Sequence, residues 1–164
     1  MPELERLALR HAPALLRFEQ VNRAYFARFV PDRGDDYFDK FADRLAGLLA
    51  EQDSGLCHFH VLVDDEDGTV LGRFNLVDVA DGSAELGYRV AELATGRGLA
   101  REGVRRVCKL ARDEYGLRQL VASAALANPA SLAVLRRTGF APVEEVQLSG
   151  QPCLRHVLDL TGHS

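Results

Sequence analysis

The chain has 164 residues, 47% of them hydrophobic and 27% charged, which is ordinary for one soluble globular domain over residues 1–164. It has no apolar run of about 18 residues, which argues against a membrane span, and its net charge of −4 argues against a nucleic-acid-binding protein. Three cysteines without paired spacing, and an N-terminus without signal-peptide features, favour a cytoplasmic protein with neither a disulfide framework nor a metal site.

The N-terminal third has mainly helical periodicity. A short strand is expected near 4–9, followed by a helix over 13–29 whose apolar residues recur at helical spacing. A Pro-Asp-Arg-Gly turn ends this helix. Asp35 or Asp36 then begins a second helix with an apolar stripe, and Gly55 ends it.

From residue 57 onward the pattern changes to strands. Short turns join the first three strands, so these strands form an antiparallel meander. A long helix closed by Gly116, a buried strand, a short helix and a C-terminal hairpin follow. The expected strands cover 57–63, 69–79, 84–90, 117–125, 140–148 and 152–160, and the expected helices cover 99–115 and 129–138. The chain is therefore predicted to be a mixed α+β domain.

The most informative segment is a glycine-containing loop between a strand and the long helix. It reads Thr95-Gly96-Arg97-Gly98-Leu99-Ala100-Arg101. Its small residues allow a ligand to approach the backbone, its amides and the helix dipole attract an anion, and two arginines add positive charge. The loop is predicted to hold a phosphate or pyrophosphate. A P-loop would need a Lys-Ser or Lys-Thr pair, and a dinucleotide loop would need glycine where Arg101 stands.

A second motif, Asn128-Pro129-Ala130-Ser131, also follows a strand, opens a helix and leads to Gly139-Phe140. With Glu85-Leu86-Gly87-Tyr88 and the glycine loop, it resembles the GNAT superfamily of N-acetyltransferases, specifically its RimJ/RimL-like branch. The resemblance covers about 70–140 by motif order and spacing. One departure is Thr95, which stands where the family usually has Gln or Arg.

The resemblance implies a GNAT fold, a mainly antiparallel twisted sheet flanked by helices and splayed between the strand ending at Val90 and the strand starting near Leu117. Acetyl-CoA would lie in that gap as the cosubstrate. The backbone around Tyr88 and Val90 would pair with its pantetheine arm, and Asn128 would hydrogen-bond that arm, although a turn residue before proline is the alternative. The pyrophosphate would be held by the amides of Gly96, Arg97, Gly98, Leu99, Ala100 and Arg101.

Acetyl transfer requires a base that takes a proton from the amine and an acid that protonates the leaving thiolate. Glu85 is the first candidate for the base, against an edge carboxylate with no catalytic role, and Glu144 and Glu145 are weaker candidates. Many GNAT enzymes use a tyrosine on the last helix as the acid, but the helix after Ser131 contains none. The resemblance therefore assigns the acid to Ser131, against the alternative of a helix-capping serine. A backbone N–H near Val90 would stabilise the oxyanion.

The acceptor is expected to be an amine that attacks the thioester directly. The resemblance implies the N-terminal amine of a protein, such as a ribosomal protein, while an acetyltransferase for small amines or antibiotics and a non-catalytic acyl-CoA sensor are alternatives. The acidic residues of the loop over 31–36 would attract a cationic amine, unless that loop is simply solvated. His58 and His60 are interpreted as neighbours of the acceptor cleft rather than metal ligands. A homodimer is compatible with the sequence.

Overall fold

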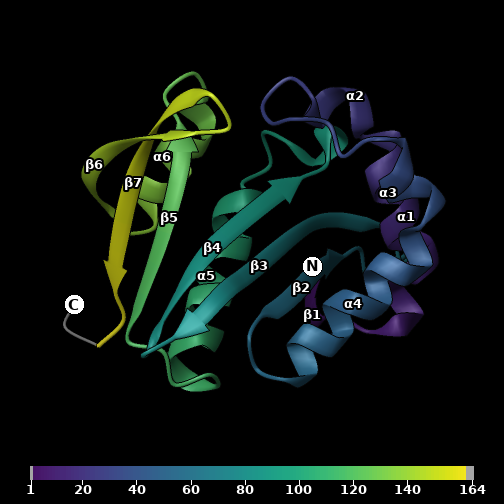
Figure 1. Cartoon of the computed structure of the whole chain (residues 1–164), viewed down its shortest axis with the longest axis horizontal. Coiled ribbons are helices and arrows are strands. Elements are labelled where there is room, and N and C mark those ends of the chain that lie inside the picture. Colours follow the sequence, from purple (N-terminus) through teal and green to yellow (C-terminus); the bar gives the residue numbers. More distant parts are fainter. Residues whose placement is uncertain (1, 162–164) are drawn as a thin grey trace.

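The computed structural model describes residues 2–161, and in this part of the chain seven strands form one sheet with the order β1-β2-β3-β4-β5-β7-β6 (Figure 1). Neighbouring strands are antiparallel, except that β4 and β5 run parallel. The expected meander and C-terminal hairpin are confirmed. The strands are β1 Glu3–Arg6, β2 His58–Val63, β3 Val70–Ala80, β4 Ser83–Val90, β5 Gln119–Ala125, β6 Ala141–Leu148 and β7 Gln151–Asp159.

Turn residues with positive φ place the hairpins of the meander. Gly68 has φ +76° in the turn between β2 and β3. Asp81 and Gly82, with φ of +53° and +79°, form the tight turn between β3 and β4. Glycine adopts this conformation freely and aspartate tolerates it, so these residues determine where each strand reverses.

Helices cover both faces of the sheet. One face carries α1 Ala12–Val21, α2 Arg23–Phe26, α3 Asp35–Asp39 and α4 Phe41–Asp53, and the other carries α5 Leu99–Asp113 and α6 Pro129–Arg137. Two short 3-10 turns, η1 Leu9–His11 and η2 Glu92–Ala94, connect elements. Figure 1 shows α5 crossing behind β3 and β4. We call the two faces the α1 face and the α5 face.

The prediction of one continuous helix over 13–29 is wrong, because Asn22 separates α1 from α2. The Nδ2 of Asn22 donates to the carbonyl of Phe18 over 2.9 Å, and its Oδ1 accepts from the amide of Glu92 over 2.9 Å. Asparagine side chains compete in this way with the backbone bonds of a helix. The second predicted helix is likewise divided, at Lys40, into α3 and α4.

The long helix α5 packs against the sheet through a glycine. A Cβ added to Gly103 would lie 2.1 Å from the Cζ of Phe74, whose side chain is fully buried on β3. The Phe74 ring stacks in turn on Tyr88 of β4, with ring centroids 5.9 Å apart. Because Gly103 has no side chain, α5 packs closely against Phe74, which in turn contacts Tyr88 of β4.

The sheet splays between β4 and β5, as expected. These strands pair at only three positions, the last of which joins Glu85 to Val121. Beyond it β4 remains paired with β3, and β5 remains paired with β7. The two halves of the sheet therefore diverge after Glu85, and we call this divergence the fork.

Candidate active site

The fork leaves one backbone edge of β4 available to a ligand. Over 86–90, β4 pairs only with β3 among the described residues. The edge that faces β5 therefore has unused N–H and C=O groups at the level of Tyr88 and Val90. An extended molecule with amide groups can bind such an edge as an added strand.

The glycine loop lies at the end of β4 and leads into α5. Gly96 and Gly98 have φ of +76° and +72°, and α5 begins at Leu99. Within residues 2–161, the amides of Gly96, Arg97 and Gly98 donate no hydrogen bond. The first amides of α5 have no acceptor inside the helix either. Loop and helix start together present a cluster of N–H donors that suits an anion.

Unpaired positive charge surrounds these donors. In the described chain, neither Arg97 nor Arg101 forms an ion pair, whereas Arg106 is 3.0 Å from Glu102 and Arg112 is 2.8 Å from Asp113. The two arginines beside the loop can therefore engage a phosphate group, whereas Arg106 and Arg112 each have a carboxylate partner.

Asn128 has a structural role at the start of α6. It is the N-cap residue, and its Oδ1 accepts a hydrogen bond from the amide of Ser131 over 3.2 Å. The cap therefore lies at Asn128, not at Ser131. Since this bond uses the amide oxygen of Asn128, its Nδ2 remains the group that can donate to a pantetheine carbonyl.

The sequence did not predict that Tyr88 and Ser131 would meet across the fork. The Oη of Tyr88 lies 3.0 Å from the Oγ of Ser131 and 3.4 Å from its carbonyl oxygen. Burial raises the pKa of Tyr88, and the hydrogen bond to Ser131 lowers it by a smaller amount. The phenol is therefore protonated at neutral pH, and it can donate a proton to the serine.

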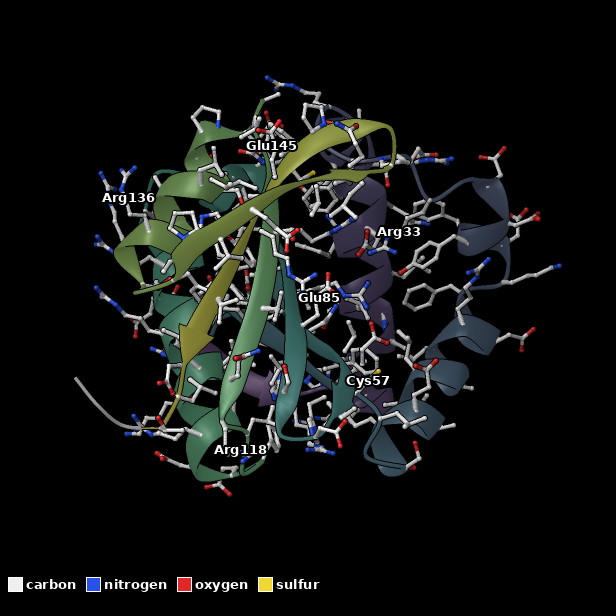
Figure 2. The ribbon with its side chains drawn as sticks, turned by 60° about the vertical axis from the view of Figure 1, so that its left-hand side comes forward. Arg33, Cys57, Glu85, Arg118, Arg136 and Glu145 are labelled. Atoms are coloured by element: carbon white, nitrogen blue, oxygen red, sulfur yellow. The ribbon has the colours of Figure 1, made fainter. Side chains whose placement is uncertain are left out.

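Glu85 and Ser131 lie on opposite sides of the fork. Side chains alternate along β4, so Glu85 faces the α1 face and Tyr88 faces the α5 face. The Glu85 side chain is exposed at the last paired position before the strands diverge. Figure 2 shows it halfway along the sheet, whereas Glu145 lies near the β6–β7 hairpin at the top of the view. Glu144 and Glu145 lie on β6, which β7 separates from β5.

His58 and His60, interpreted as neighbours of the acceptor cleft, both pack on the α5 face. His58 stacks on Tyr115 with a centroid separation of 3.7 Å, and the Nε2 of His60 lies 2.6 Å from the Tyr115 hydroxyl. Burial lowers the pKa of His60 to about 4, so the ring is neutral. No group of three or more metal-ligating side chains is found in the described part of the chain.

A buried ionic cluster on the α1 face was not predicted from the sequence. Glu19 of α1 lies between Arg33 and two arginines of the sheet, Arg73 and Arg89. Arg73 stands inside the otherwise apolar segment Val70-Leu71-Gly72-Arg73-Phe74. A charged residue in a buried strand normally needs a partner, and this was the available signal.

A fork beside a loop of free amides, with a carboxylate on one side and a hydroxyl pair on the other, suits a coenzyme-A-dependent acyltransferase. The family described as "Acetyltransferase (GNAT) domain" matches residues 3–141, so the chain belongs to the GNAT acetyltransferases. It is an acetyltransferase with acetyl-CoA as acetyl donor. Among residues 2–161, no helix is both long and apolar enough to cross a membrane.

Known proteins of this family resemble the chain in sequence and fold. A probable N-acetyltransferase of Bacillus subtilis (strain 168), YjcK, is 29% identical over 137 residues, which are 76% of this chain and 72% of that protein. The crystal structure of the ribosomal-protein-S5-alanine acetyltransferase of Vibrio fischeri has a TM-score of 0.91 at 18% identity, covering 98% of this chain and 93% of that one. Spermidine N-acetyltransferase of Vibrio cholerae, in complex with CoA and spermine, has a TM-score of 0.80 at 16% identity, covering 98% of this chain and 96% of that one. At these identities the structures support the fold alone.

Proposed function

We propose that this acetyltransferase transfers acetyl directly from acetyl-CoA to the N-terminal amine of a polypeptide. The observation that carries the proposal is the position of Glu85, the last residue of β4 that pairs with β5 before the two strands diverge. A thioester bound along the free edge of β4 would present its carbonyl beside this carboxylate. Similarity to an acetyltransferase of ribosomal protein S5 favours a polypeptide acceptor.

In the proposed reaction, Glu85 removes a proton from the ammonium form of the acceptor, directly or through water, and passes it to solvent. An ammonium group has no lone pair, so this step generates the nucleophile. The amine nitrogen then bonds to the acetyl carbon, and the oxyanion accepts hydrogen bonds from backbone N–H groups near Val90. After the attack, Glu85 takes the second proton that the nitrogen must lose to become an amide. No covalent enzyme intermediate is needed, because the amine attacks the thioester itself.

The carbon–sulfur bond then breaks and the thiolate must take up a proton. Ser131 donates it from Oγ, and Tyr88 returns a proton to Ser131 across their 3.0 Å contact. Solvent finally reprotonates Tyr88. This pair replaces the tyrosine that other members of the family carry on the helix after Ser131, where this chain has none.

In the proposed complex, the free amides of the loop over 96–101 donate hydrogen bonds to the pyrophosphate of acetyl-CoA. The side chains of Arg97 and Arg101 neutralise its negative charge. The edge of β4 at Tyr88 and Val90 pairs with the pantetheine amides. Nδ2 of Asn128 donates to the same arm. Each of these roles uses a hydrogen-bonding group that has no partner within the described chain.

The test is a pair of matched substitutions, Glu85→Gln and Glu145→Gln. Glu85→Gln should lower kcat by about a hundredfold and leave calorimetric binding of acetyl-CoA unchanged, because the base acts in the chemical step. Glu145→Gln, on the edge strand β6, should retain the wild-type rate if Glu85 is the base. Equal rates for wild type and Glu85→Gln would refute Glu85 as the base. Binding of acetyl-CoA without transfer to any amine would instead indicate a sensor.

A further inference from the structure

The buried ionic cluster on the α1 face carries more positive than negative charge. The side chain of Glu19 is only 1% exposed. Its carboxylate accepts hydrogen bonds from Nε of Arg33 over 2.9 Å, from Nη1 of Arg73 over 2.8 Å and from Nη1 of Arg89 over 3.3 Å. One carboxylate therefore serves three guanidinium groups. Arg73 also donates to the hydroxyl of Tyr37 over 3.2 Å, but that oxygen carries no charge.

Within this cluster the three guanidinium groups exceed the single carboxylate by two charges. Arg33 and Arg89 also lie over the rings of Tyr37 and Phe26, each 4.6 Å from the ring centroid, but these contacts add no negative charge. Arg73 and Arg89 are directly opposite each other on β3 and β4, where like charges repel. Arg89 has the longest of the three contacts with Glu19. Burial first, and then the charge of Arg33, lower the pKa of Arg89 to about 10. A second anion next to Arg33 and Arg89 would relieve this imbalance.

The nearby aspartates do not supply that anion. Arg23 holds Asp32 at 2.8 Å and Asp35 at 2.9 Å. Even with these groups included, the four arginines Arg23, Arg33, Arg73 and Arg89 outnumber the three carboxylates. Arg23 thus engages two aspartates of the acidic loop, and Asp36 is the loop's one carboxylate without an ion pair among the described residues.

The underpaired arginines line an open hollow next to the fork. A hollow of about 200 Å³, counted with the solvent at its mouth, is lined by three arginines, two carboxylates and an apolar wall. The arginines are Arg23, Arg33 and Arg89, the carboxylates are Glu19 and Asp32, and the wall includes Phe26, Pro31 and Phe38. The side chains of Arg33 and Arg89 reach solvent, with 29% and 23% of their surface exposed. The hollow thus combines accessible positive charge with an apolar wall.

Strand β4 leads from this hollow to the proposed base. Glu85, Gly87 and Arg89 alternate along β4 and share the α1 face. A Cβ at Gly87 would meet nothing within 4 Å, so the space between the two charged residues is open. Four residues of a strand span about 13 Å, which a few residues of an extended chain can cover.

We infer that the acceptor carries a carboxylate, which Arg33 and Arg89 bind in the hollow while the amine lies beside Glu85. This inference rests on the proposed function and names its substrate class: an amine with an acidic group a few residues away. A polyamine would meet a net positive charge and is disfavoured. The carboxylate belongs either to an acidic side chain near a polypeptide N-terminus or to a small amino acid derivative.

The experiment compares acceptors that differ in a single charge. C-terminally amidated hexapeptides of alanine carry one Asp, Asn or Lys at the second, third or fourth residue, and amidated and free dipeptides form the small-molecule arm. Release of CoA thiol gives kcat/KM. At the best position the Asp peptide should exceed its Asn counterpart by about tenfold or more, since a charge-assisted contact is worth about that much. The Lys peptide should be the poorest acceptor.

Variants connect this preference to the two arginines. Arg33→Gln and Arg89→Gln should each reduce the Asp-to-Asn ratio towards one, and Arg89→Lys should restore part of it. Arg28→Gln, an exposed arginine of the same region outside the hollow, should keep the wild-type ratio. Circular dichroism melts would confirm that each variant is folded.

The outcomes separate this inference from the proposed function. Equal rates with Asp, Asn and Lys peptides would overturn the carboxylate site and leave the transferase standing. A preference retained in Arg33→Gln and Arg89→Gln would also overturn it. If no peptide is acetylated, calorimetry with N-acetylated Asp and Asn product peptides in the presence of CoA decides the matter. Tighter binding of the Asp product would support the site although the proposed transfer fails, and equal or absent binding would overturn it.

Discussion

The contact of Gly103 with Phe74 predicts that alanine at this helical position destabilises the protein. A Cβ would lie 2.1, 2.5 and 2.6 Å from three ring atoms of Phe74, well inside the normal carbon separation of about 3.5–4.0 Å. The ring is fully buried and stacked on Tyr88, so it has little room to move. Overpacking of this severity costs about 3 kcal/mol, and the gain in helix propensity offsets about 1 kcal/mol. The free energy of unfolding should therefore fall by about 2 kcal/mol.

Gly47→Ala is the matched control, because Gly47 is an exposed glycine within α4 and a Cβ there meets nothing within 4 Å. It should gain about 0.5–1 kcal/mol from helix propensity alone. Urea unfolding at pH 7 should therefore move the two midpoints in opposite directions with unchanged m-values. Stabilisation by Gly103→Ala, equal to that of Gly47→Ala, would refute the close-packing argument.

A second substitution tests whether the cost comes from this contact. Phe74→Leu shortens the side chain that meets the new Cβ, so Gly103→Ala should cost less in that background, with a coupling of about 0.5–3 kcal/mol. Simple additivity would mean that the cost arises elsewhere on α5. Gly103→Ala should also slow turnover, because Phe74 supports Tyr88 and Tyr88 contacts Ser131.

Two further predictions concern buried ionisable groups. Glu19→Gln removes the single carboxylate that three arginines share, and it should cost about 3–5 kcal/mol in urea unfolding at pH 7; a loss below about 1 kcal/mol would contradict this. Burial lowers the pKa of His60 to about 4 from its ordinary 6.5, so the unfolded chain binds more protons between these values. The free energy of unfolding should therefore fall by about 1.4 kcal/mol per unit as pH drops from 6.5 to 4, and His60→Gln should flatten this slope.

Local sequence patterns were sufficient to predict most of the fold. Turns at Gly68 and at Asp81-Gly82 mark the reversals of the meander, and the strands and helices were located to within a few residues. The break at Asn22 was not predicted, because it depends on a hydrogen bond to the amide of Glu92, 70 residues away. Helical periodicity reports only on neighbours within a turn or two, so a distant partner leaves no trace in it.

The glycine loop was likewise evident from sequence, because its function depends on backbone amides and on small residues within one short segment. The tertiary structure alone decided that Glu85 and Ser131 lie on opposite sides of the fork, that Tyr88 reaches Ser131, and that Glu19 gathers three arginines. These contacts join residues 14 to 70 positions apart. They are set by strand register and by the packing of helices on the sheet, since a shift of one residue in β4 would move each of its side chains to the other face.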